Sequence, residues 1–260
     1  MLRRRFASAS LVAGILIASS GFAGAAPRAL LELFTSQGCS SCPPADKLLG
    51  ELTKDPSLVA LSLPIDIWDY LGWKDTLALP GHTARQRAYA EVRGDRQVYT
   101  PQLVVNGSAH VVGSDRAAIE RAVAETDRNP DIMSLAVMTS TADGTLSISV
   151  KAPPGKQTKG EVWLCPLARA ISVVVGRGEN RGHTLIYHNV VRAWRKLGDI
   201  AGADSSWRVP LDKIESGKVD AAAIIVQEGT RTKPGIVLGA AYATLGRQAA
   251  DDGAQATSSR

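Results

Sequence analysis

The sequence has few residues of the kinds that bind metals or fill aromatic cores. Its 260 residues include three cysteines, four histidines and three methionines, and aromatic residues make up 5% of the chain. A second pair of cysteines at zinc-site spacing is missing, which argues against a structural zinc centre. The main chemical signal is therefore the one close pair of thiols, Cys39 and Cys42.

The chain also lacks an apolar run long enough to span a bilayer comfortably. Arginines at 3–5 precede an apolar stretch at 11–17, and small residues follow as far as Ala25. This pattern predicts a signal peptide over residues 1–25, with an uncleaved anchor as the alternative. Cleavage would release an exported protein, in the periplasm or secreted, without stable membrane insertion.

A large charge of one sign is absent once the signal is removed. The formal net charge is +5, but three of the 30 basic residues and none of the 25 acidic ones lie in residues 1–25. The mature chain is then nearly neutral. Its composition is no argument for nucleic acid as a partner.

Cys39-Ser-Ser-Cys42 lies between a strand-like run, 29–34, and a helix-like run that opens at Pro43-Pro44. A helix N-terminus favours a thiolate over a thiol, so Cys39 is the predicted nucleophile. Cys42 is close enough to resolve a mixed disulfide, and export permits the pair to rest as a disulfide. The alternatives are a purely structural disulfide or half of a metal site.

The mature chain is long enough for two domains. Helix-like and strand-like runs alternate over 26–129, whereas 130–246 reads as strands and turns typical of an antiparallel β-sandwich, and 247–260 as a disordered tail. The strands predicted in the second region are 134–140, 145–150, 160–164, 171–175, 184–194, 206–209, 219–227 and 236–244.

Aromatic residues follow the second predicted strand, 58–67. A helix between this strand and the first implies a parallel pair, so the loops after both strands meet at one edge of the sheet. That places Trp68, Tyr70 and Trp73 beside the cysteines, where they form either a substrate-gripping rim or a local core.

The order strand, CxxC helix, strand, helix, proline-led hairpin and closing helix resembles the thioredoxin superfamily. Five motifs are more specific, and together they resemble a secreted, thioredoxin-like family of unknown function, domain-of-unknown-function family 1223. They are LFTSQGCSSCPPAD at 33–46, WDYLGWKD at 68–75, RQRAY at 85–89, YTPQ at 99–102 and GENRG at 178–182. The resemblance implies a two-domain α+β fold, in which a thioredoxin-like α/β domain precedes an all-β sandwich-like domain, and a redox role without a named substrate.

The resemblance also suggests roles for three residues. Pro101, preceded by Thr100, matches the cis-proline that faces the CxxC in thioredoxin-like proteins and helps to hold substrate; the alternative is a plain turn proline. Glu32 lies near the place of a buried acid that exchanges a proton with Cys42, or else it points outward at the sheet edge. Asp66 and Asp69 are weaker candidates for that proton exchange.

The favoured function is an exported thiol–disulfide oxidoreductase that needs no cofactor and exchanges with protein or small thiols and disulfides, or with a redox partner protein. One alternative is a copper(I)-binding thiol protein, although His82 and His110 lack motif spacing to the cysteines. Another is a non-catalytic adaptor with a structural disulfide. The odd thiol, Cys165, is expected to be a buried small hydrophobe, or else to pair between molecules.

Overall fold

The chain forms strands along most of its length and places its α-helices in the first half. The structure is a computed structural model that describes residues 26–153, 155, 158–202, 204–214 and 217–246. The elements of the first half are β1 (Ala29–Thr35), α1 (Pro43–Leu52), β2 (Leu58–Pro64), the 3-10 helix η1 (Asp69–Leu71), α2 (Pro80–Arg93), β3 (Gln102–Val105), β4 (Ala109–Val112) and α3 (Arg116–Thr126). Those of the second half are β5 (Ala136–Ala142), β6 (Thr145–Lys151), β7 (Lys159–Val174), β8 (Thr184–Val191), β9 (Arg195–Ala201), β10 (Ser205–Pro210), the 3-10 helix η2 (Leu211–Lys213), β11 (Ala221–Thr230) and β12 (Lys233–Thr244).

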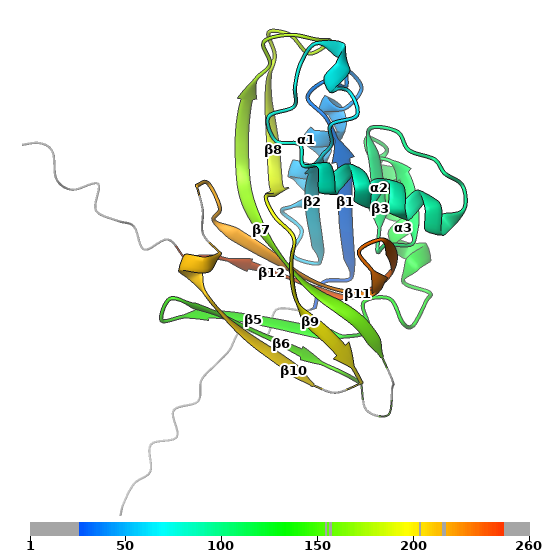
Figure 1. Ribbon diagram of the computed structural model, residues 1–260. Helices are drawn as coiled ribbons and strands as arrows, with labels where there is room; N and C mark the ends of the chain where they lie inside the picture. Colours follow the sequence, from blue (N-terminus) through cyan, green and yellow to red (C-terminus); the bar gives the residue numbers. More distant parts are fainter. Residues whose placement is uncertain (1–25, 154, 156–157, 203, 215–216, 247–260) are drawn as a thin grey trace, which may run out of the picture.

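Strands from both halves share one mixed sheet of nine strands (Figure 1). Its order is β12-β11-β7-β8-β2-β1-β3-β4, with β9 paired to β7 off this path. The join is a parallel pairing of β2 with β8, at Ser62 opposite Val190. A second sheet, β10-β6-β5, has three strands. The predicted signal peptide, 1–25, and tail, 247–260, lie outside the described residues.

The predicted fold class is wrong. The sequence suggested a thioredoxin-like α/β domain followed by a self-contained all-β sandwich, but five strands of the second half extend the sheet that β1–β4 begin. The physical reason is that the outer edge of β2 presents unpaired backbone groups, which β8 covers. Periodicity identifies a strand but not the distant edge with which it pairs. The limit at 129–130 stays a prediction and falls between α3 and β5.

β1 alternates its side chains between two cores. Leu31 and Leu33 pack with α1 and α3 on one face of the sheet. Leu30 and Phe34 pack on the other face with Tyr89 of α2. Because every residue of β1 is buried, a polar residue on either face must find its partners inside the protein.

The strand β7 belongs to the large sheet and packs against the three-stranded sheet. Its first part pairs with β9 and its second part with β8, and Pro166 lies where the partner changes. A proline lacks the N–H of a regular ladder, and this switch is a place where a strand tolerates that loss. Val162 and Leu164 of β7 share a core with Ile148 of the three-stranded sheet, which therefore packs against the far end of the large sheet. Among the described helices, none is long and apolar enough to cross a membrane.

Candidate functional site

Cys39 and Cys42 form a disulfide at the start of α1. Their Cα atoms are 5.4 Å apart, and Cys42 is the N-cap of the helix, with Pro43 and Pro44 in its first turn. The backbone N–H of Cys39 donates to the Ser36 carbonyl, which curls the chain toward the helix. Cys39 is 5% exposed, whereas Cys42 is completely buried. A partner can therefore reach Cys39 far more easily than Cys42.

A cleft of about 160 Å³ opens beside Cys39. Two of the predicted binding residues meet there, because the Trp68 indole N–H donates to the Thr100 hydroxyl at 2.8 Å. The Thr100–Pro101 peptide bond is cis, and the Thr100 carbonyl accepts from Ser41. The residues that line the cleft are Gly38, Cys39, Ser40, Ser41, Trp68, Leu71, Thr100 and Glu179.

The other two predicted aromatic residues lie outside the cleft lining. Tyr70 is 75% exposed, with its ring centroid 6.2 Å from that of Trp68. Trp73 supports the loop before the cysteines, since its indole N–H donates to the side-chain oxygen of Gln37 at 2.8 Å. Trp68 therefore lines the cleft, Tyr70 lies next to Trp68, and Trp73 stabilises the loop before the cysteines.

The β7–β8 loop, residues 175–183, covers the CxxC turn from the second half of the chain. The Asn180 side-chain amide donates to the carbonyls of Gln37 and Cys39 at 3.0 and 2.9 Å. Beside it, the Glu179 carboxylate accepts from the Ser40 N–H at 3.2 Å. Gly178 has a φ of +78°, and a Cβ there would lie 3.4 Å from Trp73. The GENRG motif, which the sequence offered only as part of the family resemblance, therefore contributes to the site.

Glu32 is buried on the other face of the sheet from α1 and Cys42. Its carboxylate accepts two hydrogen bonds from Arg85, at 2.7 and 3.1 Å, and one from the Tyr89 hydroxyl at 2.6 Å. Gln227 completes the network by contacting both Arg85 and Tyr89 at 2.8 Å. The structure therefore does not bring Glu32 together with the cysteines, and its carboxylate is engaged elsewhere.

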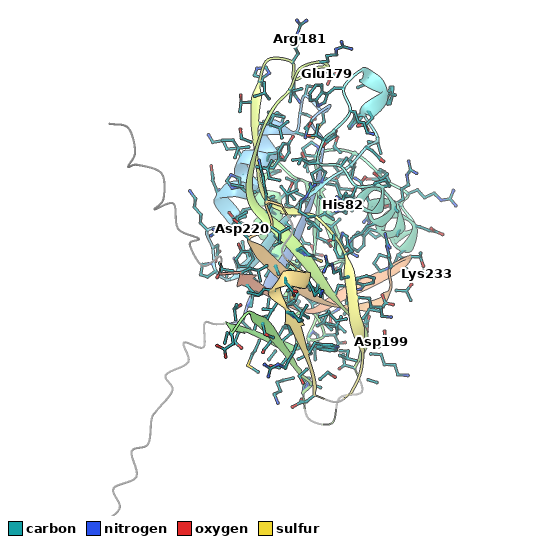
Figure 2. All side chains as sticks on the ribbon, turned by 60° about the vertical axis from the view of Figure 1, so that its left-hand side comes forward. His82, Glu179, Arg181, Asp199, Asp220 and Lys233 are labelled. Atoms are coloured by element: carbon teal, nitrogen blue, oxygen red, sulfur yellow. A yellow bond between two sulfur atoms is a disulfide. The ribbon has the colours of Figure 1, made fainter. Side chains whose placement is uncertain are left out.

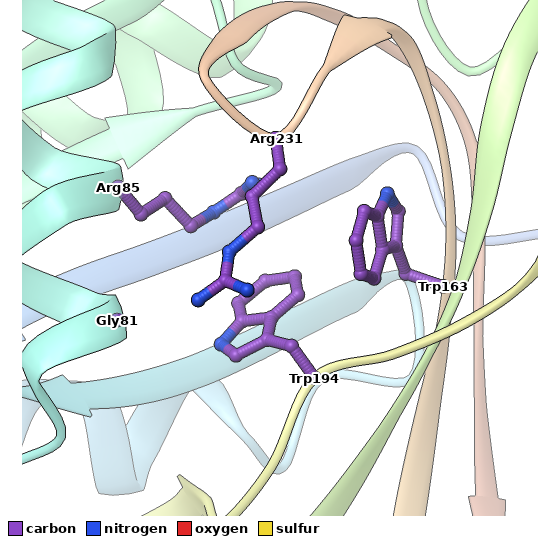
Figure 3. A pocket seen from close by; sticks show the side chains of 5 residues that line it. All are labelled: Gly81, Arg85, Trp163, Trp194 and Arg231. Carbon is purple, nitrogen blue, oxygen red and sulfur yellow. The ribbon is translucent and has the colours of Figure 1, made fainter.

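Aromatic rings cover the Arg85 end of this network (Figure 3). The Arg85 guanidinium lies 4.3 Å from the Trp194 ring centroid, and Trp163 meets Trp194 edge to face. Burial alone would lower the pKa of Arg85, but the interactions with Glu32 and Tyr89 together outweigh it and raise that pKa. Arg85 is consequently a permanent, internally neutralised cation, as expected of a structural ion pair.

Asp46 is the site residue that sequence reasoning missed. It lies one helical turn after Cys42, donates its backbone N–H to the Cys42 carbonyl at 3.0 Å, and is 4% exposed. Among the described residues, neither carboxylate oxygen has a partner of good hydrogen-bond geometry, although the Thr35 hydroxyl is close enough to stabilise the ionised form. Burial raises the pKa of Asp46 well above its usual value, and the neighbouring Thr35 hydroxyl offsets only part of this rise. The signal available in the sequence was its spacing of four from Cys42, which places both on one side of the helix.

Further buried polar groups lie on the strands that contact α1. The hydroxyls of Thr35, Ser62 and Tyr187 are buried and lack hydrogen-bond partners among the described residues. Burial, followed by the charges of Asp46 and Asp75, raises the pKa of Tyr187. Burial also raises the pKa of Asp75, although three backbone N–H groups, including that of Gln37, hydrogen-bond to it. A proton on Asp46 relieves the repulsion from Asp75.

Cys165, His82 and His110 make their contacts with residues other than the CxxC. Cys165 is a free, buried thiol in the core on the α2 side, and burial raises its pKa. His82 contacts the Pro64 carbonyl, and burial lowers its pKa to about 4. His110 interacts with Asp95 and Tyr99. Within the described ranges, no group of three or more His, Cys, Asp or Glu side chains is arranged to hold a metal ion.

Fold and site together define a mixed α/β protein with a covered CxxC disulfide at one end of its large sheet. The chain belongs to a family described as protein of unknown function DUF1223, whose model matches residues 30–227. It is similar to the crystal structure of protein AGR_C_4864 from Agrobacterium tumefaciens, with a TM-score of 0.77 and 29% identity. That match covers 88% of this chain and 99% of the other. No curated protein matches the sequence.

Proposed function

We propose that the protein is an exported thiol–disulfide oxidoreductase that uses Cys39 to attack and Cys42 to resolve. The observation that carries the proposal is the unequal placement of two bonded sulfurs. Cys39 lines an open cleft, whereas Cys42 is buried at the N-cap of α1. Exchange requires this inequality, because one sulfur must meet a partner while the other waits within reach of the mixed disulfide.

In the reducing direction, the Cys39 thiolate attacks one sulfur of a substrate disulfide and the substrate S–S bond breaks. One substrate thiolate leaves and takes a proton from water, while the other half stays bonded to Cys39. Cys42 then attacks the Cys39 sulfur and expels the second substrate thiolate, which is also protonated. The substrate gains two electrons and the cysteine pair loses two, and the reverse sequence oxidises a dithiol.

In this scheme Asp46 is the general base that accepts the proton of the Cys42 thiol. Cys42 must lose its proton before it attacks, and in its buried position water offers little help. A carboxyl whose pKa is raised by burial exchanges its proton closer to neutral pH, where a general base is most effective. The unpartnered oxygens of Asp46 are available for that proton, whereas those of Glu32 are occupied.

The partners in this proposal are protein or small-molecule thiols and disulfides, or a dedicated redox protein. An oxidising compartment suits a disulfide that rests closed, which supports export to the periplasm or beyond. Thr100, which precedes Pro101 in a cis peptide bond, and Trp68 line the cleft in which such a partner would lie, whereas Pro101 is buried behind Thr100 and does not line it.

The test is to trap the mixed disulfide. Cys42→Ser should accumulate a stable adduct on Cys39 with a model disulfide, whereas Cys39→Ser should form none and show no exchange. Cys165→Ala is the matched control, since that thiol is buried away from the cleft, and it should exchange at the normal rate. Equal exchange by the Cys39 and Cys42 variants would overturn the assignment of roles.

A further inference from the structure

The cleft beside Cys39 carries a single formal charge. Of the eight residues that line it, only Glu179 is ionisable apart from the cysteine itself. Trp68 and Leu71 supply an apolar wall, and Ser40, Ser41 and Thr100 supply neutral hydroxyls. A substrate group that enters beside the reacting sulfur therefore meets a negative charge against an apolar surface.

The Glu179 carboxylate is held in place at the cleft. Its Oε2 accepts from the N–H of Ser40, the residue that follows the reacting cysteine. The next residue, Asn180, is 5% exposed and anchors the loop through both of its hydrogen bonds to the CxxC turn. A charge fixed by a buried anchor keeps its position when substrate arrives, so its effect does not depend on reordering the loop.

The cationic residues of the same loop do not cancel this charge in the cleft. Arg177 and Arg181 are exposed and neither lines the cleft. Figure 2 shows Arg181 and Glu179 at the tip of the loop, with the Arg181 side chain extending outward. Asp66 and Asp69 lie outside the lining and accept hydrogen bonds from Thr83 and from the Asp75 backbone.

We infer that Glu179 selects thiols and disulfides that carry a positive charge next to the reacting sulfur, such as a cysteine flanked by a basic side chain. This inference rests on the proposed exchange reaction and adds a substrate class to it. An exposed carboxylate a few ångströms from a substrate cation, in a partly solvated cleft, corresponds to a preference of about threefold to tenfold. The apolar wall would accept the carbon chain that carries the cation.

The test compares three small disulfides of similar size that differ in charge: cystamine, bis(2-hydroxyethyl) disulfide and 3,3′-dithiodipropionate. Reduced protein attacks each one through Cys39, and the rate of Cys39–Cys42 disulfide formation is followed by alkylation and mass. Each rate is divided by that of dithiothreitol with the same disulfide, which removes the differences in leaving-group acidity. The normalised order should be cystamine, then the neutral compound, then the dianion.

Glu179→Gln keeps an oxygen that can accept from Ser40 but removes the charge, so the preference for cystamine over the dianion should fall about tenfold. Arg181→Gln is the matched control: it changes the charge of the same loop outside the cleft and should leave the order unchanged. Added salt should weaken the preference of the parent protein.

Three results are distinguishable. If no disulfide reacts with the parent protein, the exchange function itself fails. If all three react but Glu179→Gln leaves each of the three rates unchanged, exchange stands and the charge selection is overturned. If the substitution changes all three rates by one factor, Glu179 acts on Cys39 rather than on the substrate, and the selection is again overturned.

Discussion

Two buried carboxylates lie on opposite faces of the same sheet, and they differ in the hydrogen bonds that they accept. Glu32, on the α2 side, accepts two hydrogen bonds from Arg85 and one from Tyr89. Asp46, on the α1 side, has no partner of good hydrogen-bond geometry for either oxygen within the part of the chain that the structure describes, and only the neighbouring Thr35 hydroxyl lowers its pKa. Both residues are less than 5% exposed, so burial is not what separates them.

The difference separates a structural acid from a reactive one. Removing one partner of a buried ion pair is costly, because the other charge is left without compensation. A buried carboxyl without partners is most stable when it holds a proton, and it can give up or take that proton as the neighbouring chemistry requires. The protein therefore places its permanent ion pair away from Cys42 and its titratable acid one turn from it.

Breaking the Glu32–Arg85 ion pair should produce the largest loss of stability. Glu32→Gln leaves the Arg85 guanidinium buried without a counter-charge, and we expect a loss of about 3–5 kcal/mol in the free energy of unfolding. Urea denaturation measures this loss. A cost below about 1 kcal/mol would mean that the network is not a structural ion pair. Exchange by the folded fraction should be unchanged, since Glu32 faces away from α1.

Replacing the unpaired acid should instead affect the reaction. Asp46→Asn removes the proton acceptor but keeps the shape of the side chain, so resolution of the mixed disulfide by Cys42 should slow about 100-fold near neutral pH. Stopped-flow measurement separates this step from the first attack by Cys39, which should keep its rate. Equal slowing of both steps would indicate a structural disturbance rather than a lost base.

Stability should depend on pH through Asp46. The unfolded carboxyl titrates near 3.8, and burial raises the folded pKa above it. Stability from this group is fully present below pH 3.8 and is lost as pH rises from there through the folded pKa, by about 1.4 kcal/mol per pH unit.

Asp46→Asn lacks this loss, so its unfolding free energy relative to the parent should increase with pH across the same window. Denaturation at a series of pH values measures the gap. A gap that is constant between pH 4 and 7 would contradict a protonated Asp46.

Two buried tyrosines provide the smallest and best matched contrast. The Tyr89 hydroxyl joins the Glu32 network, whereas the Tyr187 hydroxyl has no partner among the described residues. Tyr89→Phe should cost about 1–3 kcal/mol because it leaves buried groups unpaired. Tyr187→Phe should be close to neutral or stabilising. Similar costs for the two variants would show that the two faces of the sheet do not differ in how fully their buried hydroxyls are hydrogen-bonded.

Local patterns in the sequence predicted the elements of the first half well. The strand predicted at 29–34 and the helix predicted to open at Pro43-Pro44 correspond to β1 and α1. Pairing across the chain was beyond those patterns. Residues 160–164 and 171–175 were predicted as two separate strands, yet β7 is one strand over Lys159–Val174 and changes its partner near Pro166.

The candidate site was predictable in its cysteines and only partly in its surroundings. Helix position and spacing identified Cys39 and Cys42, and loop topology brought Trp68 to them. Which acid could exchange a proton with Cys42 depended on which one is paired with a cation inside the protein. Arg85 of α2 pairs with Glu32 of β1, and this contact is distant in the sequence. Glu179 and Asn180 come from the distant β7–β8 loop, so no local pattern around the cysteines could reveal them.

The most direct test of thiol–disulfide exchange by this protein is the equilibrium of the Cys39–Cys42 pair in glutathione redox buffers, measured by mass spectrometry after alkylation. An exchange-active pair should have a reversible midpoint within about −270 to −120 mV, the range of known exchange proteins. A pair that stays oxidised below about −300 mV would be a structural disulfide and would contradict the proposed function.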